Sequence, residues 1–424
     1  MKSLTKSSRS KLLANDAHVQ LSLPVVGVLR DVKSAFFGLC ISAGKAVLAA
    51  MMETERTALC GPKGVPSSQR HAYRGGHTQS SVVLGGRRIQ ISRPRARALG
   101  AAELSLPTFT WATQADPLNA ATMAAVAAGV STRRYRTTLD ELPAGEPQSS
   151  VSRSAVSRRF VALSAERLTT WLSRRIDMAL PVVMIDGIHF RNRVVLVALG
   201  FDTEGRKHVL GIREGSTEKT QVVRALLSDL IDRGLDAEAP RLWVIDGGKA
   251  LRRAITEVFG ASALVQRCQE HKRRNVIEHL PENLHGSVGQ ALKDAWQTKD
   301  ADLARRQLER LANSLAKAHP GAAASLREGL HETLTLIELG VDEALYRSFR
   351  TTNPIENLNG LIAHYSRNVK RWKDGQMVLR WVGCSLNEAS KGFRAVRGYR
   401  DMKHFTAALS QRVKPTAAAQ LKVA

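Results

Sequence analysis

Two short apolar segments, PVVMIDG and RLWVIDGG, each carry an aspartate followed by glycine, at Asp186 and Asp246. Apolar runs of this length bounded by turn residues are typical of strands inside a buried sheet. The pattern therefore predicts a sheet in which two strands each deliver an acid at their exit. A single Asp-Gly pair is more often a simple turn, so this interpretation depends on the rest of the chain.

A third acid, Glu356 in TTNPIENLNG, lies where a helix should begin, with Thr352 or Asn353 as its cap. The three acids are far apart in sequence, so only folding can bring them together. Carboxylates gathered without a cation would repel and raise each other's pKa, so a shared site implies bound divalent metal. Two Mg²⁺ or Mn²⁺ ions held in this way suit in-line attack on a phosphodiester. Asp186, Asp246 and Glu356 are therefore candidate catalytic residues and metal ligands of an enzyme that cuts or joins nucleic-acid strands.

The chain of 424 residues has a net charge of +25, from 63 Lys and Arg against 38 Asp and Glu. Such an excess attracts polyanions, and it favours DNA or RNA as the partner over a merely soluble basic protein. No run is long enough for a transmembrane helix and the amino terminus lacks a signal-peptide core, so we expect no membrane association. The four scattered cysteines favour the reducing cytoplasm, where a DNA-bound protein would lie at the nucleoid.

Residues 1–112 read as an amino-terminal DNA-binding region with a helix and a β-hairpin. Apolar positions recur at helical spacing over 21–59, and the Gly- and Ser-rich stretch 61–80 reads as a loop. Two β-prone runs then flank a pair of glycines at 85–86, which is a strong hairpin signal because glycine accepts the positive φ of a primed turn. Arginines on the hairpin and its tail are candidate phosphate contacts, with a solvated basic face as the alternative; they are Arg93, Arg95 and Arg97.

Residues 113–176 resemble a helix-turn-helix module. Helices are expected over 117–129 and 131–142, and a third, dense in Ser and Arg at its start, from about residue 152. The amino-terminal residues of such a recognition helix reach base edges in the major groove. A plain helical bundle with a basic face is the alternative. The candidate DNA contacts on the third helix are Arg153, Ser154, Ser157, Arg158 and Arg159.

From residue 177 the pattern becomes mixed α/β. Three β-rich runs joined by tight turns predict an antiparallel meander, followed by helix, strand, helix, strand and helix. This order matches a ribonuclease H-like core with a mixed five-stranded sheet, in which the first and fourth strands are adjacent and their acids converge. We expect the core to occupy 177–281 and 346–412, a helical insertion to occupy 282–345, and 413–424 to be a disordered tail.

The motifs of this chain resemble those of bacterial Mutator-type transposases, insertion-sequence enzymes with a DDE triad. The resemblance runs from about Arg74 to Met402. It rests on VVMIDG, on LGIREGSTE, on VIDGGKALRRAI through VQRCQEHKRRNV, and on TTNPIENLN.

The resemblance implies Asp186, Asp246 and Glu356 as ligands of two Mg²⁺ or Mn²⁺ ions. It implies Cys268 and His271 as the family's C-x-x-H element, with a structural role near the site, where we also place Asn353. The C-x-x-H pair is half of a zinc pattern with no evident second half, so zinc is the less favoured alternative. One position departs from the family, which often has a basic residue seven positions after the glutamate, where this chain has Ala363.

The expected function is therefore that of a DNA transposase. It would bind the terminal inverted repeats of its insertion sequence, cleave strands there, and transfer them to target DNA. Two ends must be paired, so a homo-oligomer, at least a dimer on DNA, is expected. Two alternatives stay open: a catalytically impaired copy that only binds DNA, which Ala363 favours weakly, and a structure-selective nuclease on the same fold.

Overall fold

The computed structural model describes residues 32–66, 72–84, 87–100, 102–114, 153–215 and 219–413. It divides after Phe160 into two compact units, each with its own internal packing. Helix α4 (Arg153–Leu172) spans this division. The two units are described separately below.

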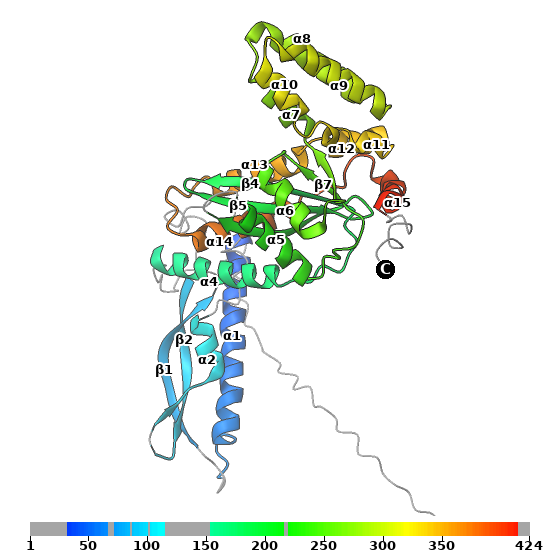
Figure 1. Ribbon diagram of the computed structural model, residues 1–424. Helices are drawn as coiled ribbons and strands as arrows, with labels where there is room; N and C mark the ends of the chain where they lie inside the picture. Colours follow the sequence, from blue (N-terminus) through cyan, green and yellow to red (C-terminus); the bar gives the residue numbers. More distant parts are fainter. Residues whose placement is uncertain are drawn as a thin grey trace, which may run out of the picture. The chain divides into compact units, whose positions relative to one another are not determined.

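The first unit is built on a long helix and a long hairpin. Helix α1 (Val32–Cys60) lies along strands β1 (Ala72–Leu84) and β2 (Arg87–Ala98), which pair antiparallel from Ala72–Ala98 to Leu84–Arg87 (Figure 1). The hairpin predicted around residues 85–86 is thus confirmed by its strands, while the two glycines themselves lie outside the described residues. The short strand β3 (Glu103–Leu104) and helix α2 (Pro107–Gln114) complete the unit.

The prediction of a loop over 61–80 is wrong for residues 72–80, which belong to β1. Gly75 and Gly76 had indicated a loop, but they form a bulge where the register shifts between Arg74 and His77, and Gly76 has φ +74°. A bulge bends a strand without ending it, and glycine supplies the positive φ. A Cβ at Gly75 would lie 3.2 Å from Cβ of Arg95, so the close approach of the strands favours glycine there.

The second unit contains a five-stranded mixed sheet in the order β6-β5-β4-β7-β8. The first three strands form the predicted antiparallel meander, and β7 and β8 run parallel to β4. The first and fourth strands in chain order are therefore adjacent, as predicted. The strands are β4 (Val182–Phe190), β5 (Arg193–Phe201), β6 (Lys207–Gly215), β7 (Leu242–Ile245) and β8 (Leu264–Arg267).

Both faces of this sheet are covered, which explains the nearly continuous apolar run of β5. Val195, Val197 and Leu199 belong to one core, and Leu196 and Ala198 to the other. On the first face pack α13 (Asn353–Ser366), α14 (Gly375–Ser390) and the carboxyl-terminal half of α4. On the second pack α5 (Thr220–Asp232) and α6 (Lys249–Phe259), so the unit has helix, sheet and helix layers (Figure 1).

Residues 282–345 are helical and have a hydrophobic cluster of their own, which also takes in Val276 of α7 (Gln269–Ile277). The fully buried Lys272 of α7 fixes this segment to the sheet unit, because its Nζ donates to the carbonyls of Ser325 and Glu328 at 2.6 and 2.5 Å. Burial lowers the pKa of Lys272 to about 8. The elements from here to the end of the described chain are α8 (Glu282–Gln297), α9 (Ala301–Ala316), α10 (Pro320–Arg327), η3 (His331–Thr333), α11 (Thr335–Glu338), α12 (Glu343–Phe349), α13, α14, η4 (Tyr399–Asp401) and α15 (Met402–Val413).

Several expectations fall outside the described residues. These are the helices expected over 117–129 and 131–142, and the tail, of which only residue 413 is described. The third helix of the expected helix-turn-helix is present as α4, which begins at Arg153.

Gly234 follows α5 with φ +109°, and a Cβ there would lie 2.6 Å from the carbonyl oxygen of Ile176. Gly234→Ala should therefore lower the free energy of unfolding by about 2 kcal/mol or more, from backbone strain and the clash together. Gly286→Ala is the matched control, because a Cβ at this position in α8 meets nothing within 4 Å. It should be neutral or stabilising, by up to about 1 kcal/mol. Denaturant unfolding measures both, and equal effects would contradict the assignment.

Candidate active site

Asp186 and Asp246 are carried by neighbouring parallel strands: Asp186 lies in β4, and Asp246 directly follows β7. Val182 pairs with Leu242 and Met184 with Val244, and each aspartate comes two residues after the second pair. Met184 and Val244 both belong to the core under α13. Because side chains alternate along a strand, the aspartates point to this same face.

The two aspartates differ in local setting. Asp246 directly follows the last residue of β7 and precedes α6, and its Oδ1 accepts a hydrogen bond from the Gly248 amide at 2.8 Å. The prediction that Asp186 also ends its strand is wrong. Strand β4 continues to Phe190, because β5 offers it pairing partners as far as Arg193. The pairing of β4 with β7, in contrast, ends at Met184 and Val244, two residues before Asp186.

The loop after Asp246 has little freedom. Gly247 has φ +103°, and a Cβ there would lie 2.0 Å from Nε of the buried Arg267. The guanidinium of Arg267 donates in turn to the Glu328 carbonyl at 3.0 Å, at the end of α10. The Asp246 turn is therefore packed against an arginine that the following helical segment holds in place.

Helix α13 brings the third acid to the same face. Thr352 is its N-cap and Glu356 lies in its first turn, where a carboxylate is stabilised by the helix dipole. One turn later, Nδ2 of Asn359 donates to Oδ2 of Asp186 at 2.8 Å. The side chain of Asn359 thus ties α13 directly to β4, against which the helix lies (Figure 1).

Glu356 is held by a network of four residues. Oγ1 of the fully buried Thr352 hydrogen-bonds to Glu356 Oε1, and it lies 3.3 Å from both Cys268 Sγ and His271 Nδ1. Sγ of Cys268, the N-cap of α7, also accepts from the amides of His271 and Thr352, at 3.5 and 3.4 Å. Cys268 and His271 therefore lie directly beside the third acid.

Electrostatics in this network favour a protonated imidazole. The hydrogen bond with Cys268 and the negative charges of Cys268, Glu356 and Asp246 together raise the pKa of His271 to about 9, against the effect of burial. Burial alone would raise the pKa of Cys268, but hydrogen bonds from His271 and Thr352 lower it. A protonated imidazole has a proton on Nδ1, which lies 3.3 Å from Thr352 Oγ1, and the Thr352 hydroxyl in turn hydrogen-bonds to Glu356 Oε1.

In the described residues, one group of ligand atoms lies close enough together to hold a metal ion. Ligand atoms of Cys268, His271 and Glu356 lie within 4.8 Å of one another, but the Thr352 hydroxyl occupies the space between them. The three acids and Asn359 carry oxygens, which are the ligands that Mg²⁺ and Mn²⁺ prefer. Oδ1 of Asn359 is buried and has no hydrogen-bond partner in the described part of the chain, as an oxygen awaiting a cation would be.

Comparison with known proteins identifies the family. The model of the Mutator family of transposases matches residues 30–395, which include all three acids and the C-x-x-H pair. The chain belongs to the Mutator family of transposases.

Relatives within the family are transposases of bacterial insertion sequences. The transposase for insertion sequence element ISRM5 of Rhizobium meliloti is 26% identical over 368 residues, covering 84% of this chain and 89% of that protein. The transposase for IS256 in transposon Tn4001 of Staphylococcus aureus is 24% identical over 353 residues, covering 79% and 86%. That for IS6120 of Mycolicibacterium smegmatis is 32% identical over 179 residues, covering 41% and 54%.

Ala363, where the resemblance led us to expect a basic residue, is exposed on α13. Nearby cations follow at the end of the helix: Arg367 is exposed and its Nη1 contacts the ring of His364, and Lys370 is exposed as well. Asn353 is also exposed, and its backbone amide lies 3.4 Å from Thr351 Oγ1 at the start of α13. Within the described part of the chain, its side chain makes no hydrogen bond to the acids.

The residues expected to contact DNA differ in exposure and in their partners within the protein. Ser157 and Arg158 are exposed on α4, whereas the side chains of Arg153, Ser154 and Arg159 lie outside the description. Arg93 and Arg95 both bind Glu103, at 2.6 and 2.7 Å, and Arg93 also lies over the ring of Phe109. Arg97 is exposed. Of the hairpin arginines proposed, Arg97 is thus the best placed for phosphate.

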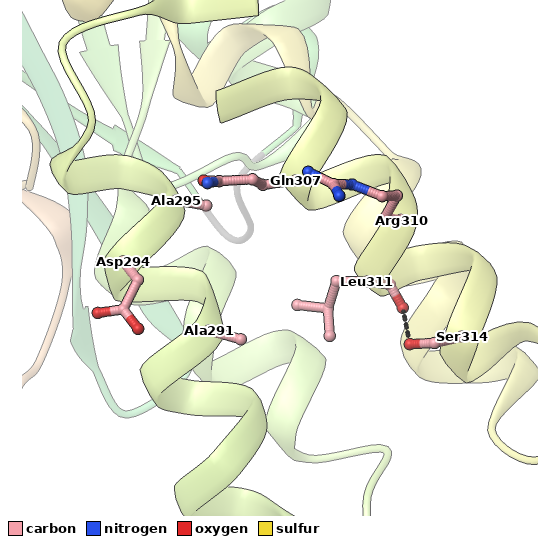
Figure 2. Close-up of a pocket in the computed structure, with 7 residues that line it drawn as sticks. All are labelled: Ala291, Asp294, Ala295, Gln307, Arg310, Leu311 and Ser314. Carbon is pink, nitrogen blue, oxygen red and sulfur yellow. Dashed lines mark hydrogen bonds between the residues drawn. The ribbon is translucent and has the colours of Figure 1, made fainter. Parts of the chain in front are cut away.

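A surface hollow of about 470 Å³ lies between α8 and α9, and Figure 2 shows its lining side chains. Asp294 of α8 and Arg310 of α9 are among them, and none of the three acids lines it.

In the described part of the chain, no helix is both long and apolar enough to cross a bilayer.

Sequence reasoning missed the side chains that orient the acids. Thr352 was considered only as a cap, and Asn359 was not considered as a site residue. Asn359 could have been found from its spacing, because it lies three residues after Glu356 and hence on the same helix face. No comparable signal marks Arg267, whose contacts with Gly247 and Glu328 depend on distant segments.

Thr352→Val should separate the hydroxyl from the shape of the residue. The valine fills the same space but leaves Glu356 and His271 without their shared partner, so we expect a loss of about 1–2 kcal/mol in the free energy of unfolding. Thr352→Ser, the control, retains the hydroxyl and should keep the network, although it loses a methyl group. Urea titrations of the three proteins without metal would check this. A serine variant less stable than the valine variant would contradict the network.

Proposed function

We propose that this chain is an active DDE transposase that binds the terminal inverted repeats of its insertion sequence and carries out metal-dependent strand cleavage and strand transfer. The observation that supports this best is the pairing register of β4 with β7. The β4–β7 register aligns Asp186 with Asp246, and the bond from Asn359 to Asp186 fixes the helix that carries Glu356 on the same face.

We further propose that the second unit is a ribonuclease H-like core. The meander of β4, β5 and β6, the parallel addition of β7 and β8, and helices on both faces agree with this fold. So does the location of one acid on the first strand and of another directly after the fourth. In the proposed organisation, 177–281 and 346–412 form the core, 282–345 the insertion, and 1–112 and 113–176 the DNA-binding regions.

The oxygen set fits divalent cations of the hard type. Asp186, Asp246 and Glu356 would hold two Mg²⁺ or Mn²⁺ ions, and Asn359 Oδ1 is available beside them. Such ions, when bound, activate a hydroxyl nucleophile and stabilise the leaving oxygen of a phosphodiester.

The side chains around the acids would supply orientation. Nδ2 of Asn359 fixes one oxygen of Asp186, the Gly248 amide fixes one oxygen of Asp246, and the Thr352 hydroxyl fixes one oxygen of Glu356. Each carboxylate thus has one oxygen held by a protein donor, which fixes the orientation of the group. A site whose ligands are already oriented loses less free energy when the cations bind.

The partner in this proposal is double-stranded DNA, both the terminal repeats and the target. The net charge of +25 supports it, because phosphate neutralisation supplies most of the affinity for DNA. We propose at least a dimer on DNA, since two ends must be processed together, and a place at the nucleoid in the cytoplasm.

Removing one charge from the acids should abolish chemistry and spare DNA binding. Asp186→Asn, Asp246→Asn and Glu356→Gln keep the shapes of the side chains but weaken the hold on the cations. Each should reduce strand cleavage in Mg²⁺ or Mn²⁺ by about a thousandfold or more, and the double variants should lose little further activity. Asp302→Asn, an exposed acid of α9, is the matched control and should cleave normally. Cleavage of labelled end DNA measures the rates.

The same assay distinguishes the alternatives. A near-normal rate for Glu356→Gln would reject the triad. A wild-type chain that binds its end DNA but never cleaves it, even in Mn²⁺, would identify an impaired copy. Cleavage that depends on DNA structure and ignores the end sequence would identify a nuclease.

Specific and non-specific contacts should also separate. Arg158→Ala on α4 should weaken binding to end DNA by about 1–3 kcal/mol and leave binding to random duplex almost unchanged, if α4 reads base edges. Arg97→Ala should weaken both, because a phosphate contact carries no sequence information. Titrations with the two duplexes at several salt concentrations measure this. Equal losses on both duplexes for Arg158→Ala would reject α4 as a recognition helix.

A further inference from the structure

We infer that the outer face of the β1–β2 hairpin reads base edges in the major groove of the end DNA, a role that rests on the proposed function and adds a second reading element to it. The hairpin was expected to contribute only phosphate contacts. The structure shows that the hairpin also has a face with glutamine and serine side chains.

The distal part of the hairpin is a two-stranded ribbon. Strand β3 pairs with Ala96 and Arg97 of β2, and among the described residues no third strand pairs with the stretch from Thr78–Arg93 to Leu84–Arg87. The major groove of B-DNA, about 12 Å wide, admits a two-stranded ribbon of this kind.

The apolar side chains on one face of the ribbon are buried against helix α1. Val82 and Ile91 pack with Leu48 and Met52 of α1. Nearer the turn, Leu84 and Ile89 pack with Ile41 of the same helix. Helix α1 therefore supports the ribbon from behind along its length (Figure 1), which fixes the direction of the opposite face.

The opposite face presents amides and hydroxyls. Gln79 lies directly across from Ser92, and Ser81 directly across from Gln90. Gln79, Gln90 and Ser92 are exposed and Ser81 is half-buried. Farther toward the turn this face continues with Val83, which is buried, and Arg88, which is exposed. The exposed part is thus a patch of two glutamines and two serines beside an arginine.

These side chains are suited to base edges. A glutamine amide both donates and accepts, so it can bind N6 and N7 of adenine together, and serine hydroxyls serve any base. Carboxylates, which phosphate would repel, do not occur anywhere in β1 or β2. A solvated sheet face ordinarily mixes charges of both signs, so this composition favours a polyanion as the occupant.

Arginines also lie at the base of the ribbon. Arg93 and Arg95 are held by Glu103, whereas Arg97 is exposed. Because side chains alternate along β2, Arg97 lies on the other face of the strand from Gln90 and Ser92, so a phosphate contact by Arg97 is separate from the base-reading patch.

The test is the double variant Gln79→Ala, Gln90→Ala in the full chain. The probes are duplexes from the two ends of the DNA element that carries this gene, and shuffled duplexes of equal composition. We expect binding to the end duplexes to fall by about five- to a hundredfold, as for loss of bidentate base contacts, with binding to shuffled duplexes unchanged. The slope of log K against log salt should stay the same, because no phosphate contact is lost.

Two controls complete the design. Gln290→Ala removes an exposed glutamine of α8 and should leave binding to every probe unchanged. Arg97→Ala should weaken binding to both duplexes and reduce the salt slope by about one. Equal losses on end and shuffled duplexes for the double variant, no loss at all, or equal losses on single strands of the same sequence would each overturn base reading by the ribbon.

The proposed function can fail separately. All binding is measured in the absence of divalent metal, so it does not depend on cleavage. Unchanged binding by the glutamine variant, with cleavage that still requires Asp186, would reject only the ribbon. Cleavage that persists in Asp186→Asn would reject only the triad.

Discussion

The parallel pairing of β4 with β7 is the interaction on which the site depends. It places Asp186 and Asp246 at the same level of the sheet and, through the alternation of side chains, on the same face. A slip of one residue would turn one aspartate into the opposite core, among Val183, Ile185 and Trp243. That core is fully apolar at these positions, so burial of a carboxylate there would be very unfavourable. The same apolar packing that stabilises the sheet therefore also fixes the register that aligns the two aspartates.

The third acid is positioned by polar contacts of a different kind. Glu356 receives a hydrogen bond from Thr352, while the imidazole of His271, whose pKa is raised to about 9, lies 3.7 Å away. A positive charge beside clustered carboxylates reduces their mutual repulsion before any cation binds. Cys268 serves the same arrangement, since its sulfur accepts hydrogen bonds from the residue that caps α13 and from the helix α7 that it caps itself. The C-x-x-H pair thus supports Glu356 through hydrogen bonds.

Local pattern was sufficient for much of this structure. Apolar runs ending in Asp-Gly predicted the adjacent strands, and β-prone runs on either side of two glycines predicted the hairpin. The errors arose where local composition and tertiary contacts disagree. Gly75 and Gly76 resemble a loop, yet the strand passes through them because β2 supplies partners on both sides of the bulge. Asp186 resembles a strand end, yet β5 extends the strand. Glu103 is distant from any motif, and only folding reveals that it neutralises Arg93 and Arg95. The hydrogen bond from Asn359 to Asp186 joins distant segments, so helical spacing indicates the face on which Asn359 lies but not its partner.

The meeting of Cys268 with Thr352 has a consequence for how such chains diversify. The two residues are separated by 84 positions, yet the amide of Thr352 lies 3.4 Å from the sulfur, and the amide of Gln269 bonds to the Arg350 carbonyl at 3.0 Å. The chain thus leaves the sheet unit and returns to it at almost one point. Closing a longer loop costs little additional entropy, so helices of this segment away from Glu328, whose carbonyl binds Arg267 and Lys272, could change in length without moving the glutamate from the aspartates. Such a segment can acquire new surfaces while its two ends stay fixed to the sheet unit.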